Sequence, residues 1–148
     1  MKNLLLIPIL LLTINCCNAP KNSDDAEIKE TVTKYWKAIK DNDIETYKNL
    51  FDENEEFSGG IQADLFFLHK NYEKINPNNI LLKNYKIKDT IVMFSNNKQK
   101  YVQYVVNNQG NNGNIKKPLI ITLMFYKPVG YNKIYNPSPL KNHIGWDK

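Results

Sequence analysis

A change in residue pattern near Ile80 constrains the fold most, because it divides the chain into a helical part and a strand-like part. Before it, apolar residues recur at helical spacing, which predicts three helices over residues 24–40, 44–51 and 61–75. After it, β-branched and aromatic residues are interrupted by Asn- and Gly-rich turns, which is typical of antiparallel strands. Helices followed by strands predict one α+β domain.

The strand-like part divides at its turns. We expect strands over 80–87, with an extension through 91–94, then over 100–106, 119–127 and 131–135. Pro128-Val129-Gly130 predicts the turn before the last of these strands. Residues 137–148 contain two prolines and are expected to form a C-terminal tail.

The N-terminus has the pattern of an export signal. Leu4 to Leu12 is an apolar run broken only by Pro8 and preceded by Lys2. A membrane-spanning helix needs about 20 such residues, so this run fits a removable secretory signal instead. Cys16 and Cys17, which are the only cysteines, follow it directly.

A cysteine at this place resembles the lipobox of bacterial lipoproteins, in which the cysteine becomes the lipidated N-terminus. We expect Cys16 to carry the lipid, with Cys17 as the alternative, although Asn15 stands where lipoboxes usually have Gly, Ala or Ser. Residues 1–16 are then the signal peptide and lipobox, 17–23 a tether and 24–136 the domain. The resemblance implies attachment to the inner or outer membrane of the cell envelope, with the domain in the periplasm or at the cell surface. An ordinary secretory signal is the alternative.

Charge is distributed unevenly along the chain. Residues 17–73 carry a net charge of −6 and residues 74–148 a net charge of +10, and all 20 basic residues are lysine. The bidentate contacts that read guanine and clamp phosphate need arginine, so the composition argues against nucleic-acid binding. We interpret the basic half as a solvated sheet face with exposed loops, and contact with an anionic membrane surface is the alternative.

Three segments together resemble one superfamily. They are EIKETVTKYWKAIKDNDIETYKNLF (27–51), the strand pair NYKIKDTIVMF and KYVQYVV (84–94 and 100–106), and LIITLMFYKPVGYNKIY (119–135). This order is similar to that of the nuclear transport factor 2-like superfamily, and to small lipoproteins within it. The resemblance implies three helices packed on a strongly curved antiparallel sheet of four to five strands, a cone-shaped half-barrel. The matching motifs concern packing and turns, so function does not follow from them.

Catalytic residues are sparse. His69 lies beside the apolar stripe of the third expected helix and Asp64 lies on its opposite flank, so His69 is the one candidate acid or base. A boundary histidine that makes a single hydrogen bond is the favoured interpretation. His143 is interpreted as a surface residue of the tail. No spacing of His, Cys, Asp or Glu predicts a metal site, and no motif predicts a cofactor.

Aromatic residues are the remaining signal. Tyr35, Trp36, Tyr72 and Tyr104 are the residues expected to line a pocket, if these side chains do not simply fill the core. The first functional hypothesis is therefore a non-catalytic module that binds a small amphipathic ligand. The second is a homodimer or a docking module for another envelope protein, through exposed strand residues such as Gln103 and Thr122. An enzyme that uses His69 is the third.

Overall fold

The α+β class is confirmed by a computed structural model, which describes residues 23–52, 57–78, 85–92, 96–107, 117–144 and 146. The helices are α1 (Ser23–Asp41), α2 (Ile44–Asn49), α3 (Ser58–Lys70) and α4 (Tyr72–Ile75), and the strands are β1 (Lys88–Val92), β2 (Asn97–Val106), β3 (Leu119–Phe125) and β4 (Leu140–Lys141). The strands form one antiparallel sheet in the order β1-β2-β3-β4, and this sheet is not closed.

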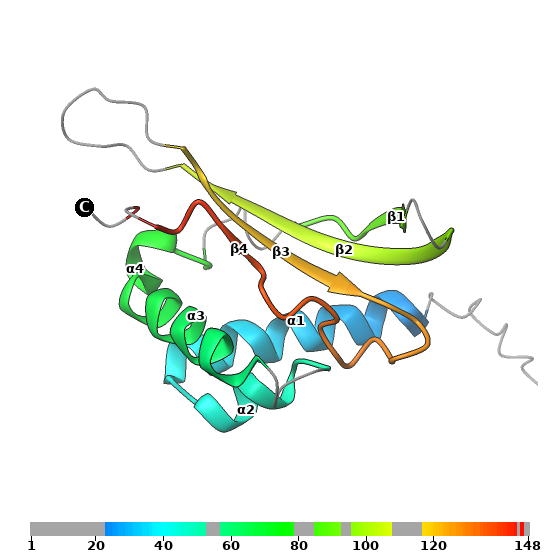
Figure 1. Ribbon diagram of the computed structural model, residues 1–148, viewed down its shortest axis with the longest axis horizontal. Helices are drawn as coiled ribbons and strands as arrows, with labels where there is room; N and C mark the ends of the chain where they lie inside the picture. The colour runs from blue at the N-terminus through cyan, green and yellow to red at the C-terminus, as the bar shows by residue number, and fades with distance from the viewer. Residues whose placement is uncertain are drawn as a thin grey trace, which may run out of the picture.

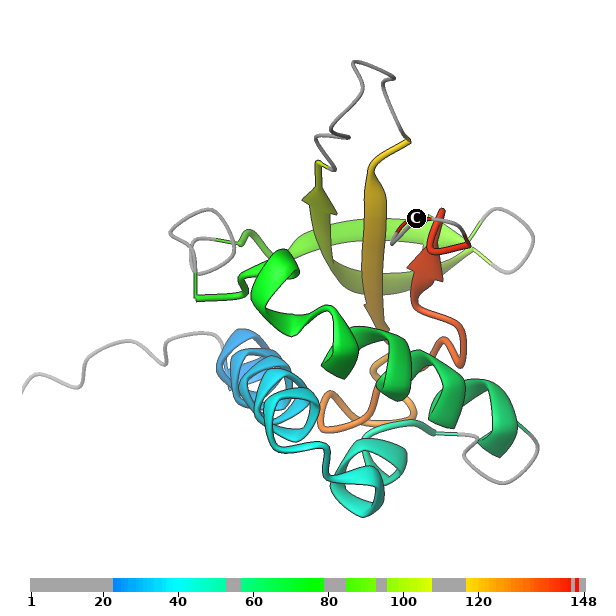
Figure 2. The ribbon, with the colours of Figure 1, turned by 90° about the vertical axis from the view of Figure 1, so that its left-hand side faces the viewer.

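The helices all lie on one side of the sheet, so the domain has two layers (Figure 1). The core lies between them. On β3 every second residue is buried, from Leu119 to Phe125, as expected of a strand with one covered face. Turned by 90°, the molecule shows α1 and α3 crossing the same face of the sheet (Figure 2).

Helix α1 forms as its apolar spacing predicts. Ile28, Val32, Tyr35 and Ile39 are buried, and their spacings of four, three and four residues place them on one face of the helix. The helix ends where Asn42 adopts a left-handed conformation with φ of 53°. Asp43 then caps α2, because its Oδ1 accepts a hydrogen bond of 3.0 Å from the backbone N–H of Thr46. The predicted break at 41–43 is confirmed.

The prediction of one helix over 61–75 is wrong, and the domain has four described helices instead of three. Asn71 separates α3 from α4. Its side-chain amide and its backbone N–H both donate to the carbonyl of Phe67, at 2.9 and 3.1 Å. An asparagine that satisfies the backbone in this way competes with continued helix, and the chain turns here.

The strand predictions hold best at the centre of the sheet. Residues 100–106 lie within β2, which begins earlier, at Asn97, and residues 119–125 form β3. Residues 85–87 of the first expected strand are not in a strand, β1 begins only at Lys88, and residues 80–84 lie outside the described part. The alternation of apolar residues therefore predicted the bounds of the central strands β2 and β3 better than those of the edge strand β1.

Residues 131–135 are not a strand, which corrects the prediction. Ile134 makes an isolated parallel bridge with Phe51 and is buried in the core. The turn before this segment is confirmed. Gly130 has φ of +99°, and a Cβ there would lie 2.7 Å from Oδ1 of Asn132, so the turn requires glycine.

The C-terminal segment contributes to the fold instead of trailing from it. Leu140 and Lys141 pair with β3 as the edge strand β4, and Trp146 is buried in the core. His143, which we expected at the surface, is half-buried and lies edge-on to the ring of Phe67 at 5.7 Å. The single apolar residues of this segment gave no periodic signal from which such packing could be predicted.

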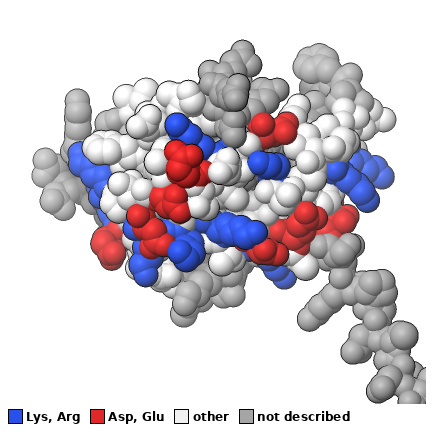
Figure 3. Space-filling view, turned by 90° about the horizontal axis from the view of Figure 1, so that it is seen from below, with Lys and Arg blue, Asp and Glu red and all other residues white. Residues whose placement is uncertain are grey.

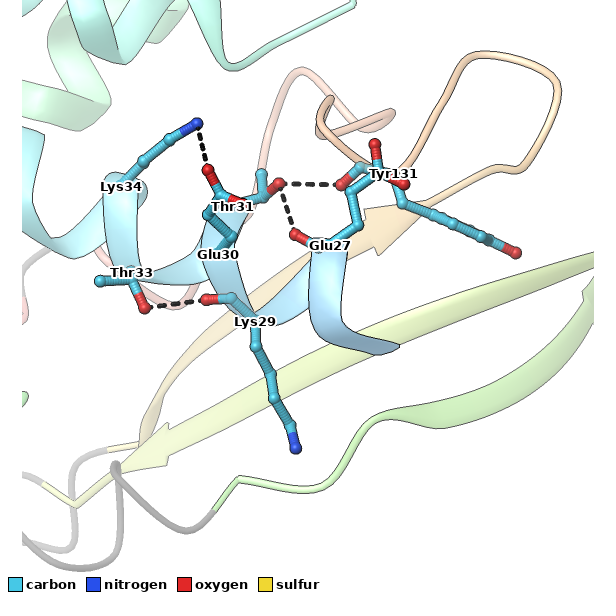
Figure 4. A network of polar contacts seen from close by, with 7 residues as sticks. All are labelled: Glu27, Lys29, Glu30, Thr31, Thr33, Lys34 and Tyr131. Carbon is cyan, nitrogen blue, oxygen red and sulfur yellow. Dashed lines mark hydrogen bonds and ion pairs between the residues drawn. The ribbon is translucent and has the colours of Figure 1, made fainter. Parts of the chain in front are cut away.

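Polar contacts fix α1 against the rest of the domain. The buried hydroxyl of Thr31 lies 2.9 Å from the carbonyl oxygen of Tyr131 and 3.0 Å from that of Glu27 (Figure 4). Near the start of α1, the ammonium of Lys100 lies 3.2 Å from carboxylate oxygens of both Asp25 and Asp89. These contacts join α1 to the sheet and to the turn after β3, so the position of the α1 surface is well defined.

Candidate functional site

A groove lies along the exposed flank of α1, and its cavity volume is about 820 Å³. Pockets of about 300–1,000 Å³ are typical of small-molecule sites. One wall is α1, and the other comes from α4, from the residues that follow it and from Tyr85. The lining residues are Lys29, Val32, Thr33, Trp36, Lys37, Lys40, Tyr72, Pro77, Asn78 and Tyr85.

The α1 wall follows from helical periodicity. Lys29, Thr33, Trp36 and Lys40 are spaced by four, three and four residues, so they form one stripe along the helix. This stripe lies beside the core stripe that contains Tyr35. Lysines therefore stand at both ends of the wall, with the Trp36 ring between them.

Aromatic contacts form the base of the groove. The Trp36 ring packs edge-on against Tyr104, with 5.3 Å between ring centroids, and Tyr104 packs edge-on against Tyr85 at 5.7 Å. On its other side Trp36 meets Tyr35 at 5.3 Å. Such edge-to-face pairs hold an indole in one orientation, which gives a ligand a preformed apolar surface.

Two of the four predicted pocket residues line this groove. Trp36 and Tyr72 belong to its lining, whereas Tyr35 and Tyr104 are buried behind it, with 0% and 2% of their surface exposed. Sequence reasoning missed Tyr85, Pro77 and the lysines. A helical-wheel plot of α1 places Lys29 and Lys40 on the Trp36 stripe, so the lysines could have been found, but nothing local marks Tyr85.

The phenols of the groove are neutral at ordinary pH. Burial raises the pKa of both Tyr72 and Tyr85, and it raises the pKa of Tyr104 well above its usual range. The side chain of Asn78 interacts with the Tyr72 hydroxyl. The tyrosines can therefore donate or accept hydrogen bonds but supply no charge, so the charged groups among the described lining residues are three lysines.

A second polar cluster lies deeper, between α1, α2 and α3. Asp64 is buried, and desolvation raises the pKa of its carboxyl from 3.8 to about 6. The hydroxyls of Tyr35 and Tyr47 are both buried in this cluster, and both feel the charge of Asp64. None of these three residues lines the groove, so the cluster is a property of the core.

His69 is not paired with Asp64. Its Nδ1 lies 2.8 Å from the carbonyl oxygen of Ile39 in the last turn of α1. Because a carbonyl only accepts, Nδ1 carries the hydrogen of this bond. The ring thereby gives a second donor to a carbonyl at the end of α1, which also accepts a hydrogen bond of 3.3 Å from the backbone N–H of Asn42. His69 also lies outside the groove lining, so the structure does not bring the predicted acid or base to the pocket.

The described ranges contain neither a metal-ligand cluster nor a membrane-spanning helix. Within them no three side chains of His, Cys, Asp or Glu come together as metal ligands. No helix there has the length and apolarity needed to cross a membrane. Cys16 and Cys17, and with them the predicted lipid anchor, lie outside the described residues.

Comparison of the chain with family models, with characterised proteins and with solved structures finds no match. The groove and the sequence pattern of the N-terminus are therefore the features that bear on function.

Proposed function

We propose that this chain is a lipid-anchored envelope protein whose domain binds a small amphipathic ligand without transforming it. The groove along α1 carries the proposal. It combines a volume suited to a small molecule with an aromatic base and a polar rim, the pattern expected of a ligand site. The anchor rests on the apolar run and on Cys16, or alternatively Cys17, as argued from the sequence.

The proposal includes the finer fold assignment. We infer that the four-stranded sheet is the curved sheet of a nuclear transport factor 2-like cone. Two features support this: the helices precede the strands in the chain, and they cover one face of the sheet only. The proposed site, however, lies on the outer flank of α1. The lining residues of this chain place the site there, and the superfamily resemblance does not.

Native mass spectrometry tests the ligand. A chain that starts at Lys21 keeps all the core residues in the described part, which begin at Ile28, so it retains what the domain needs to fold. Gently purified protein should carry an additional small-molecule mass, and Trp36→Ala should lose it. Trp146→Phe is the matched control, because Trp146 is the other tryptophan and does not line the groove. An unliganded spectrum under all conditions, together with no binding of amphipathic probes, would contradict the proposal.

A second function is favoured by the uncovered face of the sheet. Val105 of β2 points away from the helices with 52% of its surface exposed, opposite Ile120 of β3. Gln103 and Thr122, two residues along, are joined by a hydrogen bond of 3.1 Å. This face suits a second copy or another envelope protein. Sedimentation velocity on the wild type and on Val105→Glu tests it, because a dimer through this face should dissociate in the variant.

A further inference from the structure

We propose that the occupant of the groove is an anionic amphiphile, a small molecule with an apolar body and an acidic group such as a carboxylate, sulfonate or phosphate. This inference rests on the proposed function and specifies the chemistry of the ligand. Its basis is the sign of the charges that line the groove: Lys29, Lys37 and Lys40 belong to the lining, and no Asp or Glu is among the described residues that line it.

The three lysines differ in how far their charges are already satisfied. Lys37 forms an ion pair with Asp41, because its Nζ lies 2.6 Å from Oδ2 of that residue. Neither Lys29 nor Lys40 has a carboxylate within ion-pair distance among the described residues. Figure 4 shows the Lys29 side chain directed away from the neighbouring Glu30–Lys34 pair. Two ammonium groups are thus available to a ligand.

Other charged side chains of the domain lie close to charges of the opposite sign. On the side of the molecule seen in Figure 3, acidic and basic side chains are intermixed, as is usual for a solvated surface. On α1 itself, Lys34 is paired with Glu30 at 2.8 Å. Lys40 in the last turn also complements the helix dipole, but Lys29 lies in mid-helix and has no such role.

The two lysines are too far apart to attract a ligand jointly, so the acidic group of the ligand must contact one of them directly. Lys29 and Lys40 are 11 residues apart, which is about 16 Å along the helix axis. Exposed charges are screened beyond about 8 Å at physiological ionic strength, so the two lysines do not act as one diffuse patch. The apolar body then lies against Trp36 and Tyr85 between them, where the aromatic surface is available.

A matched pair of fluorescent probes tests the proposal. 1-Anilinonaphthalene-8-sulfonate and N-phenyl-1-naphthylamine share one aromatic skeleton, and only the first carries an anionic group. We expect the chain from Lys21 to bind the sulfonate about tenfold more tightly, as one well-placed charged contact supplies. In the double variant Lys29→Gln/Lys40→Gln this advantage should disappear, while the affinity for the neutral probe stays within about twofold.

The control is Lys98→Gln/Lys141→Gln, which removes two charges from exposed positions of the sheet, on β2 and β4, outside the groove lining. It should leave the affinity for both probes unchanged within about twofold, since distant exposed charges are screened. Thermal unfolding of each variant by circular dichroism establishes that the domain stays folded.

The outcomes separate the two proposals. Equal affinity for both probes, unaffected by Lys29→Gln/Lys40→Gln but lost in Trp36→Ala, would overturn the anionic ligand and leave the groove as a binding site. An equal loss of sulfonate binding in the control variant would also overturn it, because net charge would then be the cause. Failure of both probes to bind would contradict the proposed function itself.

Discussion

Two adjacent residues of α1 show how differently the two flanks of one helix are used. Tyr35 is completely buried, between Trp36 and Tyr47, whereas Trp36 is half-buried and presents part of its ring to the groove. Both are aromatic, and they make a ring contact with each other. The Tyr35 flank therefore holds the domain together, and the Trp36 flank is available for binding.

The largest expected effect is on the buried flank. Tyr35→Ala removes a ring that is completely enclosed, so the free energy of unfolding should fall by about 3–5 kcal/mol. Urea denaturation measures this loss. Tyr35→Phe is the control: it keeps the enclosed ring and removes only the hydroxyl, so it should change stability by no more than about 1 kcal/mol. A loss in the phenylalanine variant as large as that in Tyr35→Ala would show that the hydroxyl, and not the ring, stabilises the fold.

The next effect concerns the carboxyl beside Tyr35. Burial raises the pKa of Asp64 from 3.8 to about 6, so the folded state holds this proton more tightly than the unfolded chain does. The stabilisation is complete below about pH 4 and is lost as pH rises through 6. The loss amounts to at most about 3 kcal/mol, and Asp64→Asn should abolish it.

Asp43→Asn provides a control of opposite sign. Hydrogen bonds from Thr46 lower the pKa of Asp43, so its contribution to stability is lost as pH falls. Urea denaturation from pH 2 to pH 7 compares each variant with the wild type, because the Asp43 contribution is lost only below about pH 4. A wild type that matches Asp64→Asn at every pH would show that the carboxyl of Asp64 is not desolvated.

A substitution on the open flank is expected to change stability less than Tyr35→Ala does, but to weaken ligand binding. Trp36→Ala should lower the free energy of unfolding by only about 1–2 kcal/mol, because part of the ring is already exposed. The same variant should weaken binding of an amphipathic probe by at least about tenfold. Fluorescence titration at a temperature where both proteins are folded measures it. Unchanged affinity in Trp36→Ala would place the binding site elsewhere.

The smallest effect is expected at His69. His69→Ala removes the hydrogen bond to the carbonyl of Ile39, which contributes about 1 kcal/mol. Probe binding should not change, since His69 is not part of the groove lining. Thermal unfolding and a probe titration measure the two quantities. Loss of binding with normal stability would give His69 a role in ligand recognition that its position does not suggest.

Periodicity allowed α1, α2 and the two central strands to be predicted, because each has one covered face. Tyr35 and Trp36 were found for the same reason, but the sequence could not show that one is buried and the other lines the groove. Adjacent residues of a helix point in directions about 100° apart. Which of the two faces outward depends on where the sheet ends. Asn71 was missed because a helix break by a side-chain amide leaves the apolar spacing intact. Tyr85 and Trp146 were missed as pocket and core residues because only tertiary packing places them.

The two tryptophans of the chain allow the most direct test of the binding site. Trp36 lines the groove, while Trp146 is buried outside its lining, against Phe67. Two-dimensional ¹H–¹⁵N NMR gives each indole N–H its own signal, and Trp36→Phe assigns them. Titration with 1-anilinonaphthalene-8-sulfonate should move the Trp36 signal progressively and leave the Trp146 signal in place. Movement of the Trp146 signal alone, or of neither signal at saturating probe, would contradict a ligand site on α1.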